Sequence, residues 1–481
     1  MSPEESALLQ SEAAEIIRHM EASEASRTSG DPRRLGEAIT EAQAALDLLK
    51  VHPQAAQINF RRLLTGAWKL LGLAQEDCGT EESSRAAVAA FDEALGIFVE
   101  VMDEGEPQVR HELGSLWTHR GMALLIRGGP EELPEALQSF EKAITARRSL
   151  DLEAFWHFRW GLAASLMNRA DTLTRLGSAD ELAEALKSYD EALKHLADIP
   201  SQDPPPGAVR QRQVVAWMNR GLTLQTQATE ASLRESLRSF QSAIDLLRES
   251  PIAGHPRERW TLACVLVNRG KSLLEVQPRE FENAQQTAKQ ALELLADQED
   301  KNPMAADAGL KARHTLCQAL AGLVEQSDSS QAEQVGDWTA EITDVVDDGL
   351  KIAQLWESRG FTHFRPIVLA LFRFGARIFV TFQPHFLSEF LLESLDPERS
   401  DKVLPYIPEM HSMAHEALWH AVDMVRRRYE NATGPGQAAP DPAWVERQLE
   451  VLSELQATDE RLTALRRGFL ASAVSDSFRE G

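Results

Sequence analysis

The sequence is poor in cysteine and in basic residues, and each shortage excludes a class of protein. Three cysteines, Cys78, Cys264 and Cys317, lie far apart in a chain of 481 residues. This is neither a disulfide framework nor a closely spaced zinc-binding pattern, and it fits a reducing, cytoplasmic compartment. The 50 lysines and arginines are outnumbered by 74 aspartates and glutamates, for a formal net charge of −24. Because so acidic a surface repels phosphate backbones and anionic lipids, we expect no nucleic acid and no membrane among its partners.

Long apolar runs and strand patterns are also missing. Residues 1–20 contain no basic segment followed by an apolar one, so no secretory signal is expected. The most apolar stretch, residues 366–382, is short and contains Arg373 and Arg377, which favours a buried helix over a membrane span. Alternating β-branched runs do not occur, whereas apolar residues recur at helical spacing throughout. We therefore expect an all-α fold.

A short helical pattern recurs six times in the first part of the chain. Each copy has a small residue, then an aromatic or small residue four positions later, then alanine, as in Ala136, Phe140 and Ala143. The copies lie at residues 35–49, 84–95, 133–144, 182–196, 233–244 and 281–292. Small residues at this spacing let a second helix approach closely, and the ring fills the groove beside it.

Five of these copies follow a partner helix that has its own motif. The motif joins tryptophan or leucine to glycine or alanine four positions later, and its copies begin at Trp68, Trp117, Leu166, Trp217 and Leu266. A pair of amphipathic helices repeated about every 49 residues cannot bury its apolar faces alone. The pattern is typical of a stacked α-solenoid.

The two motifs resemble those of the tetratricopeptide repeat (TPR) family, W-x2-L-G-x2-Y in the first helix and A-x3-F-x2-A in the second. The resemblance covers about residues 30–300 with degenerate, long-period repeats, and arginine replaces the motif leucine in four of them. It implies a superhelix whose concave face is lined by the first helices and binds a peptide or a protein domain. We expect a solenoid in residues 1–300, a helical C-terminal domain in 301–430, a linker in 431–442 and a final helix and tail in 443–481.

The resemblance also assigns groove-facing positions, one residue after the tryptophan position and one after the glycine position. The candidates for partner binding are Lys69, Thr118, Met122, Met167, Asp171, Met218, Leu222 and Lys271. This lining is mixed and rich in methionine, which suits an apolar helix or an extended peptide.

The arginines that replace the motif leucine are Arg120, Arg169, Arg220 and Arg269. They lie on the stripe that faces the second helix, where an unpaired guanidinium would be costly. Downstream of them, at a nearly constant separation, stand the acceptors Glu135, Glu184, Glu235 and Asn283, whereas the copy with Leu71 has Ala86 there. We expect each arginine to brace its own hairpin, with some stacking of the guanidinium on the tryptophan one turn back. In the alternative, the four form a ladder on the concave face that captures an acidic or C-terminal carboxylate segment.

A second row of arginines precedes the motif by nearly three helical turns: Arg61, Arg110, Arg159, Arg210 and Arg259. We expect these to pair with acids that follow the preceding helix, such as Asp103 and Glu104. The alternative adds them to a groove for an anionic partner.

No catalytic constellation is evident, and we expect no catalytic residue, metal or cofactor. Residues 268–272 end like a phosphate-binding loop, but Val265 stands where the motif needs its first glycine. His411 and His415 share a helix face, yet no third metal ligand can be named.

The sequence therefore favours a non-enzymatic, cytoplasmic scaffold or adaptor that binds a protein or peptide partner, and it leaves a homo-oligomer open. One alternative is a regulatory sensor that binds a short peptide or small ligand and signals through the C-terminal helices. The other is an enzyme whose site lies in residues 301–430.

Overall fold

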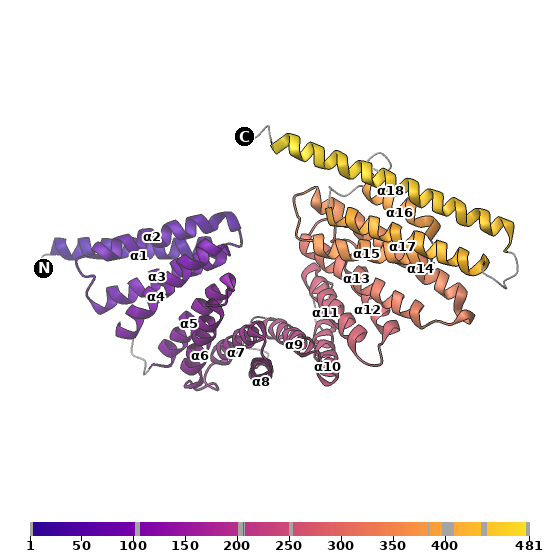
Figure 1. The fold of residues 1–481 in the computed structure, drawn as a ribbon. Coiled ribbons are helices and arrows are strands. Elements are labelled where there is room, and N and C mark those ends of the chain that lie inside the picture. The colour runs from indigo at the N-terminus through magenta and orange to yellow at the C-terminus, as the bar shows by residue number, and fades with distance from the viewer. Residues whose placement is uncertain are drawn as a thin grey trace. The chain divides into compact units, whose positions relative to one another are not determined.

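A computed structural model describes residues 3–101, 106–200, 205, 207–249, 254–382, 384–396, 408–433 and 440–477 (Figure 1). These residues form eighteen α-helices and two short 3-10 helices, and no strand occurs among them. The predicted all-α fold class is confirmed. The chain divides into two compact units, Met1–Leu246 and Leu247–Gly481. The domain boundaries expected from the sequence, including the one near residue 300, stay predictions.

The first unit is a series of helical hairpins, each made of a first and a second helix. Its helices are α1 (Pro3–Arg27), α2 (Leu35–Val51), α3 (Ile58–Cys78), α4 (Glu81–Val101), α5 (Pro107–Arg127), α6 (Glu132–Arg148), α7 (Trp156–Leu176), α8 (Ala179–Ala197), α9 (Ala208–Gln227) and α10 (Glu230–Arg248). The helices pair within hairpins, as in α3 with α4, and each second helix also packs on the next first helix, as in α4 with α5. The stacked hairpins expected from the repeat are therefore present.

Contacts between first helices show which side of this stack is the tighter one. α1 contacts α3, α3 contacts α5, α5 contacts α7 and α7 contacts α9. No comparable contact joins consecutive second helices in the described part of this unit. The hairpins therefore approach one another more closely on the side formed by α3, α5, α7 and α9, which we call the first-helix face.

The hairpins close around a glycine and a ring, as the two motifs predict. A Cβ atom on Gly121 in α5 would lie 2.6 Å from Cε1 of Phe140 in α6. The same distance separates a Cβ on Gly221 from Cε1 of Phe240. Both phenylalanines are fully buried. Only a residue without a side chain allows the second helix to seat its ring so close to the first.

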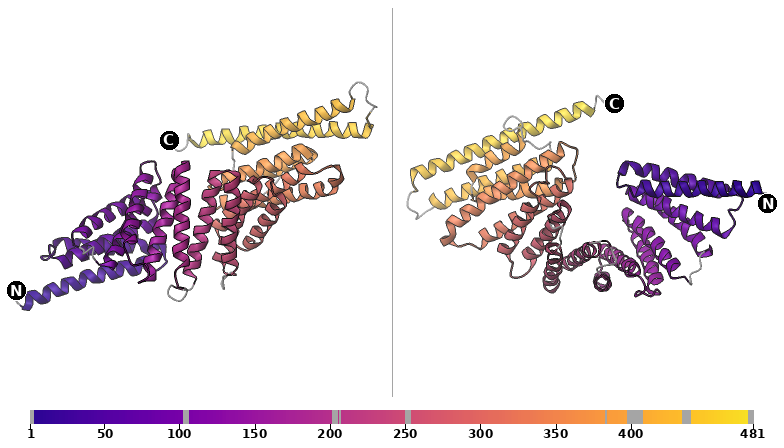
Figure 2. Two further views of the ribbon diagram at one scale, coloured as in Figure 1. Left: turned by 90° about the horizontal axis from the view of Figure 1, so that it is seen from below. Right: turned by 180° about the vertical axis from the view of Figure 1, so that it is seen from behind.

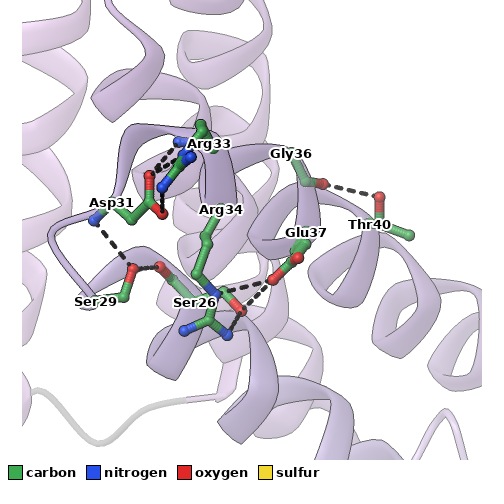
Figure 3. Close-up of polar contacts among 8 residues, drawn as sticks. All are labelled: Ser26, Ser29, Asp31, Arg33, Arg34, Gly36, Glu37 and Thr40. Carbon is green, nitrogen blue, oxygen red and sulfur yellow. Dashed lines mark hydrogen bonds and ion pairs between the residues drawn. The ribbon is translucent and has the colours of Figure 1, made fainter.

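The hairpin of α1 and α2 precedes the first full copy of the repeat, and polar contacts hold the turn between its helices (Figure 3). Asp31 accepts a hydrogen bond from the backbone N–H of Arg33 at 3.0 Å and caps the short 3-10 helix Pro32–Arg34. Arg34 donates to Glu37 at 3.0 Å and to the hydroxyl of Ser26, at the end of α1, also at 3.0 Å. α1 is therefore the first helix of the hairpin whose second helix contains the copy at residues 35–49, although the sequence of α1 has no first-helix motif.

The second unit begins with further hairpins and ends in a different packing. Its helices are α11 (Pro256–Glu275), α12 (Phe281–Leu295), α13 (Pro303–Gln326), α14 (Ala332–Glu357), α15 (Arg365–Phe382), α16 (Pro384–Leu395), α17 (Pro408–Thr433) and α18 (Pro442–Ser477), with a 3-10 turn at Ser329–Gln331. α13 packs on α11 and α12 as a first helix does, and α14 pairs with it. From α15 onward the helices pack on several neighbours, and α18 folds back along α16 and α17 (Figure 2).

Candidate functional site

Arg220 in α9 shows what the motif arginine does. Its Nε donates to Asp190 in α8 at 2.8 Å, and its Nη1 donates to Glu235 at 3.3 Å and to the Ser239 hydroxyl at 2.7 Å, both in α10. Its guanidinium carbon lies 5.6 Å from the ring centroid of Trp217, within cation–π range. One side chain thus joins its own helix to the second helices of two consecutive hairpins.

The same arrangement recurs at Arg120 and Arg169. Between 2.6 and 3.9 Å away, Arg120 has Asp92, Glu135 and Ser139 as partners, and Arg169 has Glu141, Glu184 and Ser188. The predicted pairing within the hairpin is confirmed in these three copies. Sequence reasoning missed the acid from the preceding hairpin, although Asp92, Glu141 and Asp190 all directly follow the aromatic residue of the second motif.

Arg269 departs from this arrangement. Its Nη1 donates to the Thr287 hydroxyl at 2.8 Å, while its Nε has no hydrogen-bond partner among the described residues. The expected contact with Asn283 is not formed there, because Asn283 donates to Glu280 instead, at 2.6 Å. Burial lowers the pKa of Arg269. This arginine lacks a carboxylate because amides, Asn283 and Gln241, occupy both positions that supply acids in the other copies.

The copy without an arginine lacks the polar partners as well. Leu71 is buried in α3, and the positions that elsewhere hold the two acids and the hydroxyl are Gln43, Ala86 and Ala90. The acid and the hydroxyl of the hairpin itself change together with the arginine, which supports a bracing role for the group.

The second row of arginines contacts the far end of its own hairpin. Arg110, Arg159 and Arg259 reach Ser149, Asp198 and Asp297 at 3.3, 3.4 and 2.8 Å, and Arg61 pairs with Glu100. Among the described residues, the expectation of acids after the preceding helix is met by Arg159, which also pairs with Glu153. Asp103 and Glu104 lie outside the described residues.

The expected groove residues differ in their exposure, and their role in partner binding stays a prediction. Thr118 and Met167 are buried, and Asp171 accepts hydrogen bonds from the Tyr189 hydroxyl and, at 3.0 Å, from Asn219. Burial raises the pKa of Asp171. Lys69, Met218 and Leu222 are half-buried, and Met122 and Lys271 are exposed.

In the second unit, Lys271 borders a groove between consecutive first helices. The groove has a volume of about 660 Å³ and is lined by α11, α13 and α15 together with Phe281 from α12. Its apolar surface comes from side chains such as Val267 and Phe374, and its charged rim includes Glu275 and Arg377. A groove of this size and mixed chemistry can hold several residues of a peptide.

Arg147, in the last turn of α6, is the side chain that the repeat pattern accounts for least. It is 4% exposed, and its Nη1 donates to the Thr118 hydroxyl at 2.8 Å and to that of Ser165. Its Nε has no hydrogen-bond partner, and no described carboxylate lies within ion-pair distance of it. Burial and, secondarily, Arg212 lower the pKa of Arg147 to about 10. A buried guanidinium without a counterion is costly, because it gives up its hydration.

Every other repeat has a buried apolar residue at this position: Leu49, Phe98, Leu196, Leu247 and Leu295, each at most 4% exposed. Two glycines make room for the arginine. A Cβ on Gly161 would lie 2.8 Å from Nε of Arg147, and one on Gly114 would lie 2.9 Å from its Cγ. Comparison of this position across the six copies is the sequence signal that would have found Arg147.

Arg212 in α9 is another arginine without a carboxylate partner among the described residues. Its guanidinium carbon lies 3.8 Å from the ring centroid of Trp160 in α7, and its Nη1 donates to the Trp160 carbonyl at 3.5 Å. Burial lowers its pKa to about 10. Stacking on the indole face leaves the edge of the guanidinium available for further hydrogen bonds.

His111 in α5 lies beside Arg147. Its Cε1 and the Nε of Arg147 are both 2.8 Å from the position that a Cβ on Gly161 would take, and its ring centroid is 5.2 Å from that of His157. Its Nδ1 is buried without a hydrogen-bond partner. Burial, followed by the nearby Arg147, His157 and Lys69, lowers the pKa of His111 to about 4, so its ring is neutral at pH 7. We call Lys69, His111, Arg147, His157 and Arg212 the basic cluster.

Nowhere in the described ranges do three His, Cys, Asp or Glu side chains come together as metal ligands. His415 instead contacts Asp459 of α18 at 2.6 Å. No described helix is both long and apolar enough to cross a bilayer.

The stacked hairpins define the class: this chain is an α-helical repeat protein. No family model matches it, and no curated protein matches its sequence. Among solved structures it is similar to BtubC from P. vanneervenii, with a TM-score of 0.42 and 16% identity over 56% of this chain and 94% of that one. It is similar to a Rap protein complexed with competence and sporulation factor, with a TM-score of 0.38 and 13% identity over 96% and 99% of the two chains. For yeast Tom70 the TM-score is 0.21 and the identity 11%, over 95% and 99%. These similarities are too low to carry an argument, so the class rests on this chain's own helix packing.

Proposed function

We propose that this protein is a non-enzymatic scaffold that binds a peptide segment of a partner protein along its first helices. The observation that carries the proposal is the groove beside Lys271, which is lined by three consecutive first helices of the second unit. Apolar side chains with a charged rim suit a peptide that buries some residues and leaves others in water.

We also propose that the repeats are of the tetratricopeptide kind. The paired motifs and the seating of Phe140 against Gly121 support this assignment. In this reading, the longer period lengthens the helices and the connections, while the contact between small residue and ring stays the same.

A photo-crosslinking experiment on the full chain tests the scaffold proposal. A benzoylphenylalanine is placed at Lys271 in α11 or, as a control, at Gln286 in α12 of the same hairpin. Both positions are exposed, but only Lys271 borders the groove. The modified proteins are irradiated in lysate from the native source, and the adducts are identified by mass spectrometry.

We expect a defined partner at position 271 and none at position 286. Adducts of equal identity and yield at the two positions would show that the capture reflects exposure alone. A failure to obtain adducts at position 271 would also refute the proposal.

A further inference from the structure

We propose that the basic cluster binds the carboxylates of an acidic peptide segment that lies on the first-helix face of the first unit. This inference rests on the proposed function and adds the chemistry of the partner. Its members come from α3, α5, α6, α7 and α9. A ligand that meets all of them therefore has to be extended and to present more than one anionic group.

The first support is that Arg147 occupies a position that the repeat reserves for a core residue. Leucine or phenylalanine fills it in the other five copies, and a leucine there would bury its side chain without loss of hydration. The arginine is accommodated instead by glycine at positions 114 and 161 and by hydroxyls at positions 118 and 165. The neighbouring residues therefore fit a guanidinium, although the other repeats form the same hairpin with an apolar residue at this position.

The second support is that the hydroxyls near Arg147 do not depend on it. The Thr118 and Ser165 hydroxyls lie 3.0 Å apart in a hydrogen bond to each other. The Thr118 hydroxyl donates to the Gly114 carbonyl of its own helix at 2.7 Å, and the single proton of the Ser165 hydroxyl has either the Thr118 oxygen or the Gly161 carbonyl, at 3.3 Å, as its acceptor. They orient the guanidinium, but removal of the guanidinium would leave them satisfied. A purely structural role for Arg147 is therefore poorly supported.

The third support is the charge of the surroundings. Arg120, Arg159 and Arg220, which are also largely buried, each contact carboxylates, whereas Arg147 and Arg212 make hydrogen bonds only to hydroxyl and carbonyl oxygens among the described residues. Arg269 also lacks a carboxylate, but amides occupy its acid positions. In a chain with a net charge of −24, acids were abundant enough to pair with them. The missing counterion points to a ligand that supplies it.

Fluorescence anisotropy with fluorescein-labelled hexaglutamate tests the proposal on the full chain, at near-physiological salt. The first variant is Arg147→Leu, which introduces the leucine that four of the other five repeats have at this position. Its matched control is Arg148→Leu, since Arg148 is the next residue in α6, is exposed and pairs with Glu191 at 2.7 Å. The second variant is Arg212→Gln, with Arg148→Gln as its control, and it keeps the test decisive if Arg147→Leu does not fold.

We expect hexaglutamate to bind, with binding weakened about tenfold or more by Arg147→Leu and by Arg212→Gln, because each loses a charge-assisted hydrogen bond. The Arg148 controls should change affinity by less than about twofold. Equal losses in variants and controls would indicate diffuse attraction and overturn the proposal, as would absence of binding.

Two further arms separate the source of the charge from the function. The first arm uses a hexapeptide of phosphoserine and glycine. If it binds tenfold tighter than hexaglutamate, the preferred ligand group is a phosphate and not a carboxylate, and the proposal as stated is refuted. If hexaglutamate fails to bind while position 271 still crosslinks a partner, the basic cluster is not an acidic-peptide site and the scaffold function stands. If hexaglutamate binds and position 271 gives no adduct, the scaffold proposal alone fails.

Discussion

Replacement of Arg220 by leucine tests the bracing role of the motif arginine, because the chain already contains the same replacement at Leu71. The acids that Arg220 contacts are partly solvated, with side-chain exposures of 55% for Asp190 and 36% for Glu235. Each ion pair should therefore contribute about 0.5–1 kcal/mol rather than the value of a buried pair. The hydrogen bond to the buried Ser239 hydroxyl adds about 1 kcal/mol.

Leucine recovers part of this loss, because it buries apolar surface against the second helix at about 25 cal/mol per Å². We therefore expect Arg220→Leu to lower the free energy of unfolding by about 1–2 kcal/mol. Urea denaturation of the full chain, followed by circular dichroism and tryptophan fluorescence, measures this change. Arg234→Leu is the control, since its pair with Glu230 lies on the surface of α10 and contributes little.

A fourfold variant makes the prediction sharper. Asp190→Gln, Arg220→Leu, Glu235→Ala and Ser239→Ala together copy the set Gln43, Leu71, Ala86 and Ala90. Because the four groups form one network, the combined loss should be smaller than the sum of the four single losses by about 1 kcal/mol or more. Additive losses, or an Arg220→Leu variant within about 0.3 kcal/mol of the parent, would refute the bracing role.

Three more predictions follow from local geometry. Ala228 caps the C-terminus of α9 with a φ of +50°, a left-handed conformation that strains alanine but not glycine. Ala228→Gly should therefore raise the free energy of unfolding, measured by urea denaturation, by about 0.5–1 kcal/mol. A decrease would contradict this strain. Gly121→Ala drives a Cβ into Phe140 and should cost about 1–3 kcal/mol, whereas Gly96→Ala, with no atom within 4 Å of the new Cβ, should stabilise α4 by up to about 1 kcal/mol. The opposite order of these two effects would disprove the contact. The pKa of His111 is about 4 in the folded chain, below its ordinary value of 6.5. Between pH 6.5 and 4 the unfolded chain therefore binds a proton that the folded chain does not, and the free energy of unfolding decreases as the pH falls through this range. His111→Gln should flatten the fall in Tm over that range, and parallel Tm profiles would exclude His111 as its cause.

The hairpins were predictable because their signals are local and repeated. The glycine of the first motif and the ring of the second lie a constant distance apart in the chain, so their contact recurs at Gly72 and Phe91, at Gly121 and Phe140, and at Gly221 and Phe240. The in-hairpin partner of Arg220 was predictable for the same reason, since Glu235 and the arginine are replaced together in the copy with Leu71.

The partners that sequence reasoning missed come from a different hairpin. Asp190 reaches Arg220 from the preceding repeat, and no pattern within one hairpin indicates how two hairpins stack. The helix α1 was missed as a hairpin partner because its residues carry no copy of the motif, although it packs on α2. The groove beside Lys271 likewise depends on how α11, α13 and α15 are spaced.

The sequence by itself determined the all-α class, the paired helices and the arginines within each hairpin, because these depend on helical periodicity and on contacts between residues close in the chain. Only the tertiary structure decided that Arg147 is buried without a counterion among the described residues, that His111 lies beside it, and that Arg212 is close enough to lower its pKa. The physical reason is that burial and the charge around a side chain are properties of several stacked helices. The identity of one residue reveals them only after the neighbours that surround it are known.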